Sequence, residues 1–499
     1  FLGAFPPAAL EQGLAAHAGD AAALDTLCGA LAKVHRTASG AGALPRQAPL
    51  VRGCLASPPF QVRRLGCVLM GSLLRQREGT DGDLAALVAA IGDPDTSVAQ
   101  EAKAQVLGLC KAEAEAARLL HEGPVLASVA GLAGSGESVV RLRALELLVA
   151  LASRGRGAAA AVFRSGLLEP FMQVLQDPDD VLHCLGVMEL VAGLACGAAA
   201  ETRALLVMAG GALCNLAQGE QVDLNLRTKA MSVLADVLAS AAGQGVAEEM
   251  RGLFAQFSGV LAAALGSAEA GLKQSALQAL GEFGRTQQGA NLLCDSERGL
   301  IEGLARQALS HMSHGPTQLV ALHALAAVAG SERAVRDSGT VSHDVLDPPA
   351  DDRLRQAVYA AAASPEHPVT PAEELHTLLD RPFLDIRVAT YRLISALGVR
   401  PWGAAEVCSH EALLALLLDN LKENERQGCE WKFTCLKVLE SVGRLVEAGG
   451  LGRSNIPEHM VGTLLAALPR LRAAIALGPY LPAPPGAIPD VALATRQAG

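Results

Sequence analysis

Apolar residues recur with helical spacing in a stretch that follows a short polar turn, and the same arrangement returns along the chain. In the clearest copy, Val140, Ala144, Leu147, Leu148 and Leu151 fall on one face of a helix, because residues three, four, seven and eight positions apart lie on the same side. A base directly follows the first apolar residue. The segment therefore predicts an amphipathic helix that packs along one stripe.

Copies of this helix are regularly spaced. Their first apolar residues are Val62, Val98, Val140, Leu182, Leu226, Leu272, Val320, Ile386 and Trp431. Most of the intervals are 36 to 48 residues, which is the length of a unit of two or three helices. Such a period is typical of HEAT and armadillo proteins, in which helical pairs stack side by side. The sequence therefore predicts an all-α fold, a right-handed α-solenoid of HEAT/armadillo-like repeats.

Breaks in the repeat divide the chain into five predicted segments. The start, 1–59, is expected to be an N-terminal helical cap, since a terminal repeat exposes a flank that an inner repeat buries. A first block of repeats follows at 60–335, and C-terminal helical repeats follow at 354–477. Between them, 336–353 is polar and carries two prolines, which predicts an exposed loop. The proline-rich stretch 478–499 predicts an extended tail.

Composition narrows the classes of partner. The chain has 41 basic and 51 acidic residues, and no basic cluster offsets the net charge of −10, so nucleic acid and anionic membranes are not expected as partners. The longest apolar run, roughly 318–330, is shorter than the ~20 residues that cross a bilayer. Eleven cysteines without a CxxC pair are typical of a reducing compartment. We therefore expect a cytoplasmic location, with the nucleus as a second one.

The sequence contains no GxxxxGK[ST] loop, HExxH or GxSxG motif, and no EF-hand loop, so the common phosphate-binding, zinc, nucleophile and calcium sites are not predicted. His311 and His314 have a spacing that could share a metal, and Cys408 lies close to His410. Neither pair has the further ligand or orienting group that such sites need. We therefore expect no enzymatic activity, no cofactor and no metal.

A base follows the first apolar residue in most copies of the repeat. These bases are Arg63, Arg141, Arg227, Lys273, Arg387 and Lys432, and most have an acid in the turn before them. Stacked repeats would align the bases into a ladder between neighbouring turns, where each exposed ion pair contributes roughly a few tenths of a kcal/mol. We interpret this ladder as structural.

Contact with a partner is expected on the inner curve of the solenoid, opposite the buried stripe. The candidate partner-binding residues there are Gln100, Lys103, Leu142, Glu146, Tyr391, Arg392, Phe433 and Lys437. Tyrosine and arginine are among the residue types that dominate the energy of protein interfaces. The alternative for Leu142, as for Val149, is burial by a neighbouring helix.

Several short motifs resemble those of one family. They are Gly-Asp-Pro-Asp-Thr-Ser-Val at 92–98, Gly-Glu-Ser-Val at 136–139, Ser-Gly-Leu-Leu at 165–168, Arg-Pro-Phe-Leu-Asp-Ile-Arg at 381–387, Arg-Pro-Trp-Gly at 400–403 and Gly-Pro-Tyr at 478–480. In this order they are similar to the 26S proteasome non-ATPase regulatory subunit 5 family. The resemblance covers most of the chain but not residues 1–60 or 209–221.

This resemblance implies a cytosolic chaperone for assembly of the base of the proteasome regulatory particle. Such a protein cradles the C-terminal domain of an AAA-ATPase subunit on the concave face of its solenoid. It holds this subunit together with a neighbouring ATPase and a large non-ATPase scaffold subunit, and it is absent from the mature particle. Only binding is used, which agrees with the lack of catalytic motifs.

The residues alone leave two other functions open. A general armadillo-type protein-binding adaptor or scaffold usually grips peptides with regularly placed asparagines, whereas the asparagines here are few and scattered. A HEAT-type chromophore lyase would have shorter repeats than those found. The proteins that bind the chain would separate these alternatives.

Overall fold

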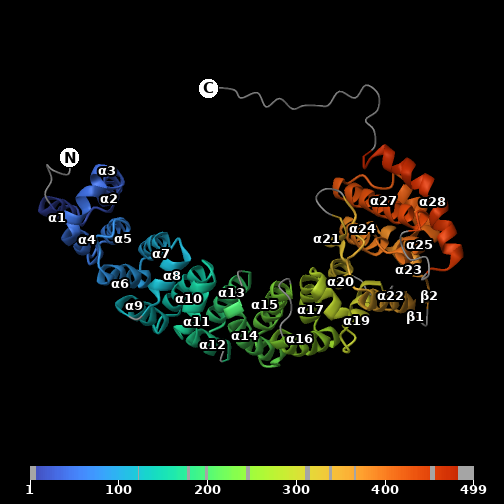
Figure 1. Ribbon diagram of the computed structural model, residues 1–499, viewed down its shortest axis with the longest axis horizontal. Coiled ribbons are helices and arrows are strands. Elements are labelled where there is room, and N and C mark those ends of the chain that lie inside the picture. The colour runs from blue at the N-terminus through green and yellow to red at the C-terminus, as the bar shows by residue number, and fades with distance from the viewer. Residues whose placement is uncertain are drawn as a thin grey trace, which may run out of the picture. The chain divides into compact units, whose positions relative to one another are not determined.

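The computed structural model describes residues 7–121, 123–176, 180–196, 200–242, 248–309, 315–335, 340–364, 367–449 and 456–480. The chain forms two compact units, unit 1 (Phe1–Phe257) and unit 2 (Ser258–Gly499). Almost all regular structure in the described residues is helical (Figure 1). The predicted all-α solenoid is therefore confirmed, whereas its right-handed sense stays a prediction.

Unit 1 begins with a helical cap and continues as paired helices. The cap contains α1 (Pro7–Ala16), α2 (Ala21–His35), α3 (Ala38–Ala43), the 3-10 helix η1 (Leu44–Gln47) and α4 (Ala48–Leu55). The repeats contain α5 (Phe60–Arg75), α6 (Asp81–Ala89), η2 (Ala90–Gly92), α7 (Thr96–Leu109), α8 (Glu113–Leu119), α9 (Pro124–Ala133), α10 (Ser138–Ala152), α11 (Arg156–Arg164), α12 (Glu169–Gln176), α13 (Val181–Cys196), α14 (Ala200–Gln218) and α15 (Leu224–Ala242). The next helix, α16 (Glu248–Gly266), crosses the boundary between the units.

The helices of unit 1 form two layers (Figure 1). The inner layer contains α5, α7, α10, α13 and α15, and the outer layer contains α4, α6, α9, α11, α12 and α14. Each inner helix packs on its inner neighbours and on an outer helix. The residues that form the core include Val140, Leu147, Leu148 and Leu151, all of them buried. The apolar stripe predicted from the sequence is therefore the surface that joins the layers.

Short polar turns determine where the helices begin. Before α7, Asp95 Oδ1 accepts hydrogen bonds from the backbone N–H groups of Ser97 (2.9 Å) and Val98 (3.3 Å). Before α6, Thr80 and Asp83 form a reciprocal capping box. These side chains satisfy N–H groups that have no partner inside a helix. Each turn thus sets the register of the helix that follows it.

Unit 2 continues the same construction. Its elements are α17 (Ala270–Phe283), α18 (Gln287–Cys294), α19 (Leu300–Leu309), α20 (Pro316–Ala329), α21 (Ser331–Ala334), α22 (Pro348–Ala362), β1 (Ala363–Ser364), β2 (His367–Pro368), α23 (Pro371–Leu379), α24 (Leu384–Gly398), α25 (Pro401–Ser409), α26 (Glu411–Leu418), α27 (Arg426–Glu447) and α28 (Glu458–Leu477). The inner layer is α17, α20, α24 and α27, each packed on the next, and α28 covers α27. The strands β1 and β2 pair antiparallel, with Ala363 opposite Pro368.

The predicted exposed loop 336–353 is wrong in its second half. α22 already begins at Pro348, because proline suits the first turn of a helix, where its missing N–H costs nothing. Val345 and Leu346 are buried, and Val345 belongs to a core cluster with Ala334, Val399 and Val438. Residues 336–339 lie outside the described residues.

The boundary between the two units lies between residues 257 and 258 rather than at this segment, because α20 packs directly on α24.

The C-terminal repeats end where the sequence predicts. α28 stops at Leu477, and residues 481–499 of the predicted tail lie outside the described residues. Within the described residues, α28 is the one helix whose length and composition would let it cross a membrane, although no run of that length was expected from the sequence. Here it packs on α27 and α25 through a side that includes Leu464, Leu468 and Leu471.

Candidate protein-binding site

Four of the eight predicted partner-binding residues line one groove in unit 1. Gln100 and Lys103 of α7 face Leu142 and Glu146 of α10 across a space of about 380 Å³, which we call the α7/α10 groove. Lys103 Nζ and Glu146 Oε2 are 2.5 Å apart, and both side chains remain partly exposed. The sequence analysis therefore selected residues that meet in space although 43 positions separate the ion-paired partners.

Two neighbouring contacts give the α7/α10 groove its shape. Arg143 Nη1 donates to the carbonyl oxygens of Ile91 (3.3 Å) and Asp93 (2.8 Å), which fixes α10 against the turn before α7. Leu142 is half-buried because it lies against Gly186 of α13, where an added Cβ would approach Leu142 Cδ2 to 2.8 Å. Leu142 thus packs on a neighbouring helix, as the alternative held, and still borders the groove.

In unit 2, Arg392 of α24 is the centre of a polar cluster on the inner layer. Its Nη1 donates to His323 Nδ1 (2.9 Å) of α20, and its Nη2 donates to Glu332 Oε1 (3.3 Å). The guanidinium carbon lies 5.4 Å from the centroid of the Trp431 ring, within the range of a cation–π contact. Arg285, which lies just after α17, also pairs with Glu332, at 2.9 Å. A space of about 320 Å³ lies beside this cluster.

Burial controls the charges in this cluster. Burial lowers the pKa of His323, and the positive charge of Arg392 lowers it further, against an opposing effect of Asp385. Burial also lowers the pKa of Arg392, and Glu332 opposes this shift. Since the hydrogen bond from Arg392 requires an acceptor at Nδ1, the imidazole is neutral with its proton on Nε2.

Four members of the Arg392 cluster were missed from the sequence, namely Arg285, His323, Glu332 and Trp431. His323 and Glu332 come from another repeat, and no spacing rule relates them to Arg392. Trp431 was assigned to the buried stripe, but it is half-buried and stacks on Arg392. A tryptophan at the first position of the stripe, where other repeats have Val, Leu or Ile, was the one signal that this repeat differs.

The prediction that Tyr391 contacts a partner is wrong. Its exposed fraction is 0%, because this side of α24 packs against α27, where Cys435 Sγ donates to the Tyr391 carbonyl oxygen (3.1 Å). Burial raises the pKa of Tyr391 above its ordinary value. An inner helix is covered by helices on both flanks, so the surface it leaves open is narrower than periodicity alone suggests.

Phe433 and Lys437 lie one turn apart on α27. Lys437 is exposed and Phe433 is half-buried, and Lys437 Nζ is 4.6 Å from the centroid of the Phe433 ring. A cation over an aromatic face presents an amphipathic surface of the kind found at interfaces. These two predicted residues are therefore available to a partner, whereas Tyr391 is not.

Cys408 and His410, which the sequence places close together, have separate structural surroundings. No group of three or more His, Cys, Asp or Glu side chains that could hold a metal occurs in the described residues, and His311 and His314 lie outside those residues. Cys408, considered with His410, is buried, and burial raises its pKa to about 12. A thiol with so high a pKa is protonated at neutral pH and is a poor nucleophile. His410 Nδ1 instead caps α26 by accepting from the Leu413 N–H (3.1 Å).

Stacked helical pairs with grooves between them define an α-solenoid, a class of repeat protein with extended binding surfaces. Residues 74–207 match the model of the family described as Proteasome non-ATPase 26S subunit. This match relates the chain to a proteasome-associated family, and the matched segment contains the whole α7/α10 groove. It does not distinguish one non-ATPase subunit from another.

No curated protein matches the chain. Similar solved structures include two crystal structures of engineered proteins from the Northeast Structural Genomics Consortium. One has 17% identity and a TM-score of 0.42, covering 89% of this chain and 98% of its own. The other has 20% identity and a TM-score of 0.36, covering 54% of this chain and 97% of its own. Likeness at this level carries no information about function.

Proposed function

We propose that this protein is a chaperone for assembly of the base of the 26S proteasome regulatory particle, and that it is absent from the mature particle. Its partner is a proteasomal AAA-ATPase subunit, held on the inner layer, with a large non-ATPase scaffold subunit as a second partner. The observation that carries the proposal is the family match over residues 74–207. That segment includes the α7/α10 groove, where four predicted partner-binding residues meet.

The geometry of the α7/α10 groove supports a protein partner. Its walls combine an ion pair, a half-buried leucine and an exposed amide within about 380 Å³, which suits insertion of one or two side chains from a convex surface. Similar exposed chemistry recurs in unit 2 at Phe433 and Lys437. A repeat protein binds broad partners by many such modest contacts along its layer.

We propose that the protein acts by binding alone, without enzymatic activity, in the cytoplasm and also in the nucleus. Shielding one ATPase surface until its neighbours are in place needs only a complementary shape and a release step. The half-exposed Lys103–Glu146 pair fits this purpose because partly solvated ion pairs contribute more to selectivity and association rate than to affinity.

The test is a pull-down from cytosolic extract with the full chain as bait, followed by identification of the bound proteins. We expect ATPase subunits of the proteasome base without the core particle. Lys103→Glu should lower their recovery about fivefold, since a reversed charge in the groove repels the complementary group. The double exchange Lys103→Glu with Glu146→Lys restores the ion pair but should not restore recovery.

Arg164→Glu is the matched control, because it reverses one exposed charge at the end of the outer helix α11. It should leave recovery unchanged. If the double-exchange variant recovers as much ATPase subunit as the unmodified chain, the α7/α10 groove is not part of the interface. Recovery of transport cargo instead of ATPase subunits would replace the chaperone by a general armadillo-type adaptor, and stoichiometric presence in mature particles would also contradict the proposal.

A further inference from the structure

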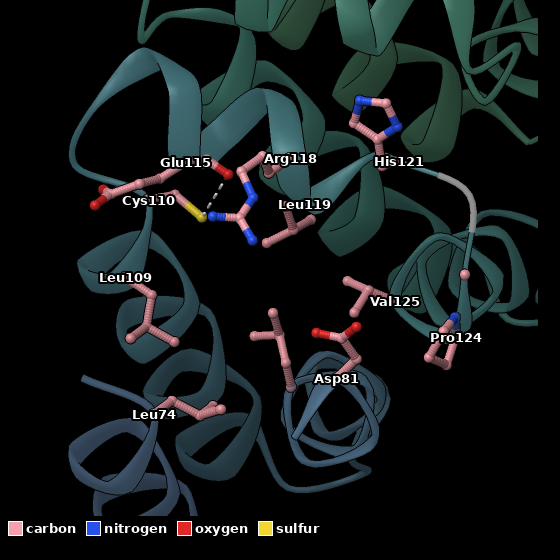
Figure 2. A pocket seen from close by; sticks show the side chains of 12 residues that line it. Leu74, Asp81, Leu109, Cys110, Glu115, Arg118, Leu119, His121, Pro124 and Val125 are labelled. Carbon is pink, nitrogen blue, oxygen red and sulfur yellow. Dashed lines mark hydrogen bonds between the residues drawn. The ribbon is translucent and has the colours of Figure 1, made fainter. Parts of the chain in front are cut away.

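A second pocket of unit 1 has a volume of about 370 Å³ and is lined by residues of five helices, α5 to α9. Figure 2 shows the side chains that converge on this space. The pocket shares no lining residue with the α7/α10 groove. Protein interiors leave few voids larger than a water molecule, and small ligands occupy pockets of roughly 300 Å³ or more. This space is therefore large enough to hold a small ligand.

Apolar side chains from all five helices line the pocket. Leu74, Leu84 and Leu109 are half-buried, whereas Leu119 and Val125 have only 4% and 7% of their surface exposed. Figure 2 shows Leu109, Leu119 and Val125 on different sides of the space. An apolar group of a ligand that enters here is therefore removed from water on several sides, which favours its binding.

Two opposite charges face this apolar space. The guanidinium of Arg118, from α8, and the carboxylate of Asp81, from α6, point toward it from opposite sides (Figure 2). Both side chains are exposed. In the part of the chain that the structure describes, neither forms an ion pair, either with the other or with a third residue. Each charge is therefore available to a ligand in the pocket.

The other titratable residues that line the pocket are engaged elsewhere or turned away. The Glu115 carboxylate accepts from the Ala112 N–H (3.1 Å) at the start of α8, and Figure 2 shows it pointing away from the space. Burial raises the pKa of Cys110 to about 11, so this thiol is uncharged at neutral pH. The ring of His121 also points away from the space (Figure 2). Among the lining residues, Arg118 and Asp81 are thus the two whose charges face it.

One cation and one anion beside an apolar surface select a ligand with three matching features. A purely apolar ligand would take both charges out of water without giving either a partner. A phosphate would attract Arg118 but would be repelled by Asp81, and a simple amine would have the reverse defect. An apolar α-amino acid carries a carboxylate, an ammonium and an apolar group on one carbon. It is therefore the class of small molecule that satisfies all three features at once.

We propose that this pocket binds a free α-amino acid with a large apolar side chain. Arg118 donates to the α-carboxylate, for which a planar guanidinium offers two parallel N–H groups. Asp81 accepts from the α-ammonium, and the side chain of the ligand lies among the leucines. The end of a polypeptide carries only one of these two charges, so the pocket distinguishes a free amino acid from a chain terminus. This site goes beyond the proposed inner-layer function and does not rest on it.

The test is isothermal titration calorimetry of the full chain with L-leucine, L-isoleucine, L-methionine and L-phenylalanine. At least one of them should bind at a single site with a Kd below about 1 mM. For the amino acid that binds best, two analogues each lack one charge: the matching amine has no carboxylate, and the matching acid has no ammonium. Each analogue should bind about tenfold more weakly, because one charge of the pocket is left without a partner. Glycine, which has no side chain, should also bind about tenfold more weakly or not at all.

Variants show which residue recognises which charge. Arg118→Gln should weaken binding of the amino acid about tenfold without weakening binding of the matching amine. Asp81→Asn should likewise weaken binding of the amino acid about tenfold without weakening binding of the matching acid. Leu74→Trp, which fills the pocket from its rim, should weaken binding of all three. The matched controls Arg164→Gln and Glu169→Gln change exposed residues elsewhere on unit 1 and should leave binding unchanged; Glu169, like Asp81, lies in the first turn of its helix.

Several outcomes would overturn the proposal. The first is that none of the four amino acids binds, either by calorimetry or by a shift of the thermal midpoint. The second is that glycine or either single-charge analogue binds as tightly as the amino acid, because the pocket would then not recognise all three features. The third is that a tetrapeptide ending in the same residue binds as tightly, which would assign the pocket to a chain terminus. Unchanged binding in both Arg118→Gln and Asp81→Asn would place the ligand at another site.

Discussion

Arg387 of α24 and Glu423, in the turn before α27, form an ion pair with two parallel hydrogen bonds. Nε donates to Oε2 and Nη2 donates to Oε1, both at 2.9 Å. Arg387 Nη1 also donates to the Pro382 carbonyl in its own turn (2.9 Å). In unit 1, Arg63 makes the same contacts with Asp93 (2.6 and 2.9 Å) and with the carbonyl oxygens of its own turn. Each arginine therefore joins one repeat to the next.

These contacts confirm the predicted ladder at Arg63 and Arg387 but change its partners. The acids belong to the following turn rather than to the preceding one. At Arg141 the following turn contributes His183 instead, whose Nδ1 accepts from Nη2 (2.9 Å). Lys432 instead donates to the Asp419 carbonyl oxygen in the turn before its own helix (2.6 Å), and Arg227 donates to the Ala217 carbonyl oxygen of the preceding helix α14 (3.2 Å). Contacts from one repeat to the next are therefore shown at Arg63, Arg141 and Arg387.

Glu423→Gln should lower the free energy of unfolding by roughly 2–3 kcal/mol. Glu423 is almost fully buried, with 1% of its side chain exposed, so its removal leaves the Arg387 charge without its partner in a poorly solvated site. Asp380→Asn is the matched control, since its ion pair with Lys422 is exposed and its loss should not be measurable. Urea unfolding followed by tryptophan fluorescence reports on unit 2, because Trp402 and Trp431 both lie there. Equal effects of the two variants would contradict this account.

Unit 2 should lose stability as the pH falls from about 7 to 5. The folded pKa of His323 lies below its ordinary value of about 6.5, so the unfolded chain takes up a proton that the folded chain does not. The contribution is fully present above about pH 6.5 and is lost as the pH falls through the folded pKa. His323→Asn, which keeps an acceptor for Arg392, should make the decline shallower. His459→Asn changes an exposed residue and should leave the slope as it is; a shallower slope there would argue against His323 as the origin.

Arg77→Gly should raise the free energy of unfolding by about 1 kcal/mol. Arg77 follows α5 with a φ of 62°, and its N–H donates to the Leu74 carbonyl oxygen (3.0 Å) while the Glu78 N–H donates to the Leu73 carbonyl oxygen (3.4 Å), which is the Schellman pattern that ends a helix. Glycine adopts this left-handed conformation without the penalty that an L side chain carries. Thermal unfolding monitored by circular dichroism measures the change. Arg77→Ala keeps the strain and removes the charge, so it should not stabilise. A gain in both variants would mean that charge repulsion, not backbone strain, is relieved.

Lys437→Glu should weaken recovery of ATPase subunits without changing stability, since Lys437 is exposed beside Phe433. Arg392→Glu is a less clean test of the inner layer. It would place a second carboxylate beside Glu332 and remove the hydrogen bond to His323, so we expect a loss of about 2 kcal/mol in stability as well. Circular dichroism and pull-down on the same preparations separate the two effects. Normal recovery with Lys437→Glu would place the binding surface away from this part of α27.

Helical periodicity is a local property, and it determined most of the architecture. The stripe of Val140, Leu147 and Leu151, repeated along the chain, predicts both the helices and the layer they form, because each copy must bury the same face. The bases after the stripe were assigned to a structural ladder for the same reason. The four residues of the α7/α10 groove could be selected from the sequence because each has a fixed position in its repeat, opposite the buried stripe.

Only the stacking of repeats decided which side chains meet. Tyr391 has the sequence position of an exposed residue, but the packing of α27 on α24 buries it. His323, Glu332 and Trp431 are far from Arg392 in the sequence, yet the packing of the helices brings all three into contact with it. Distances between residues tens of positions apart depend on how helices pack on one another, and the period of a single helix does not contain that information.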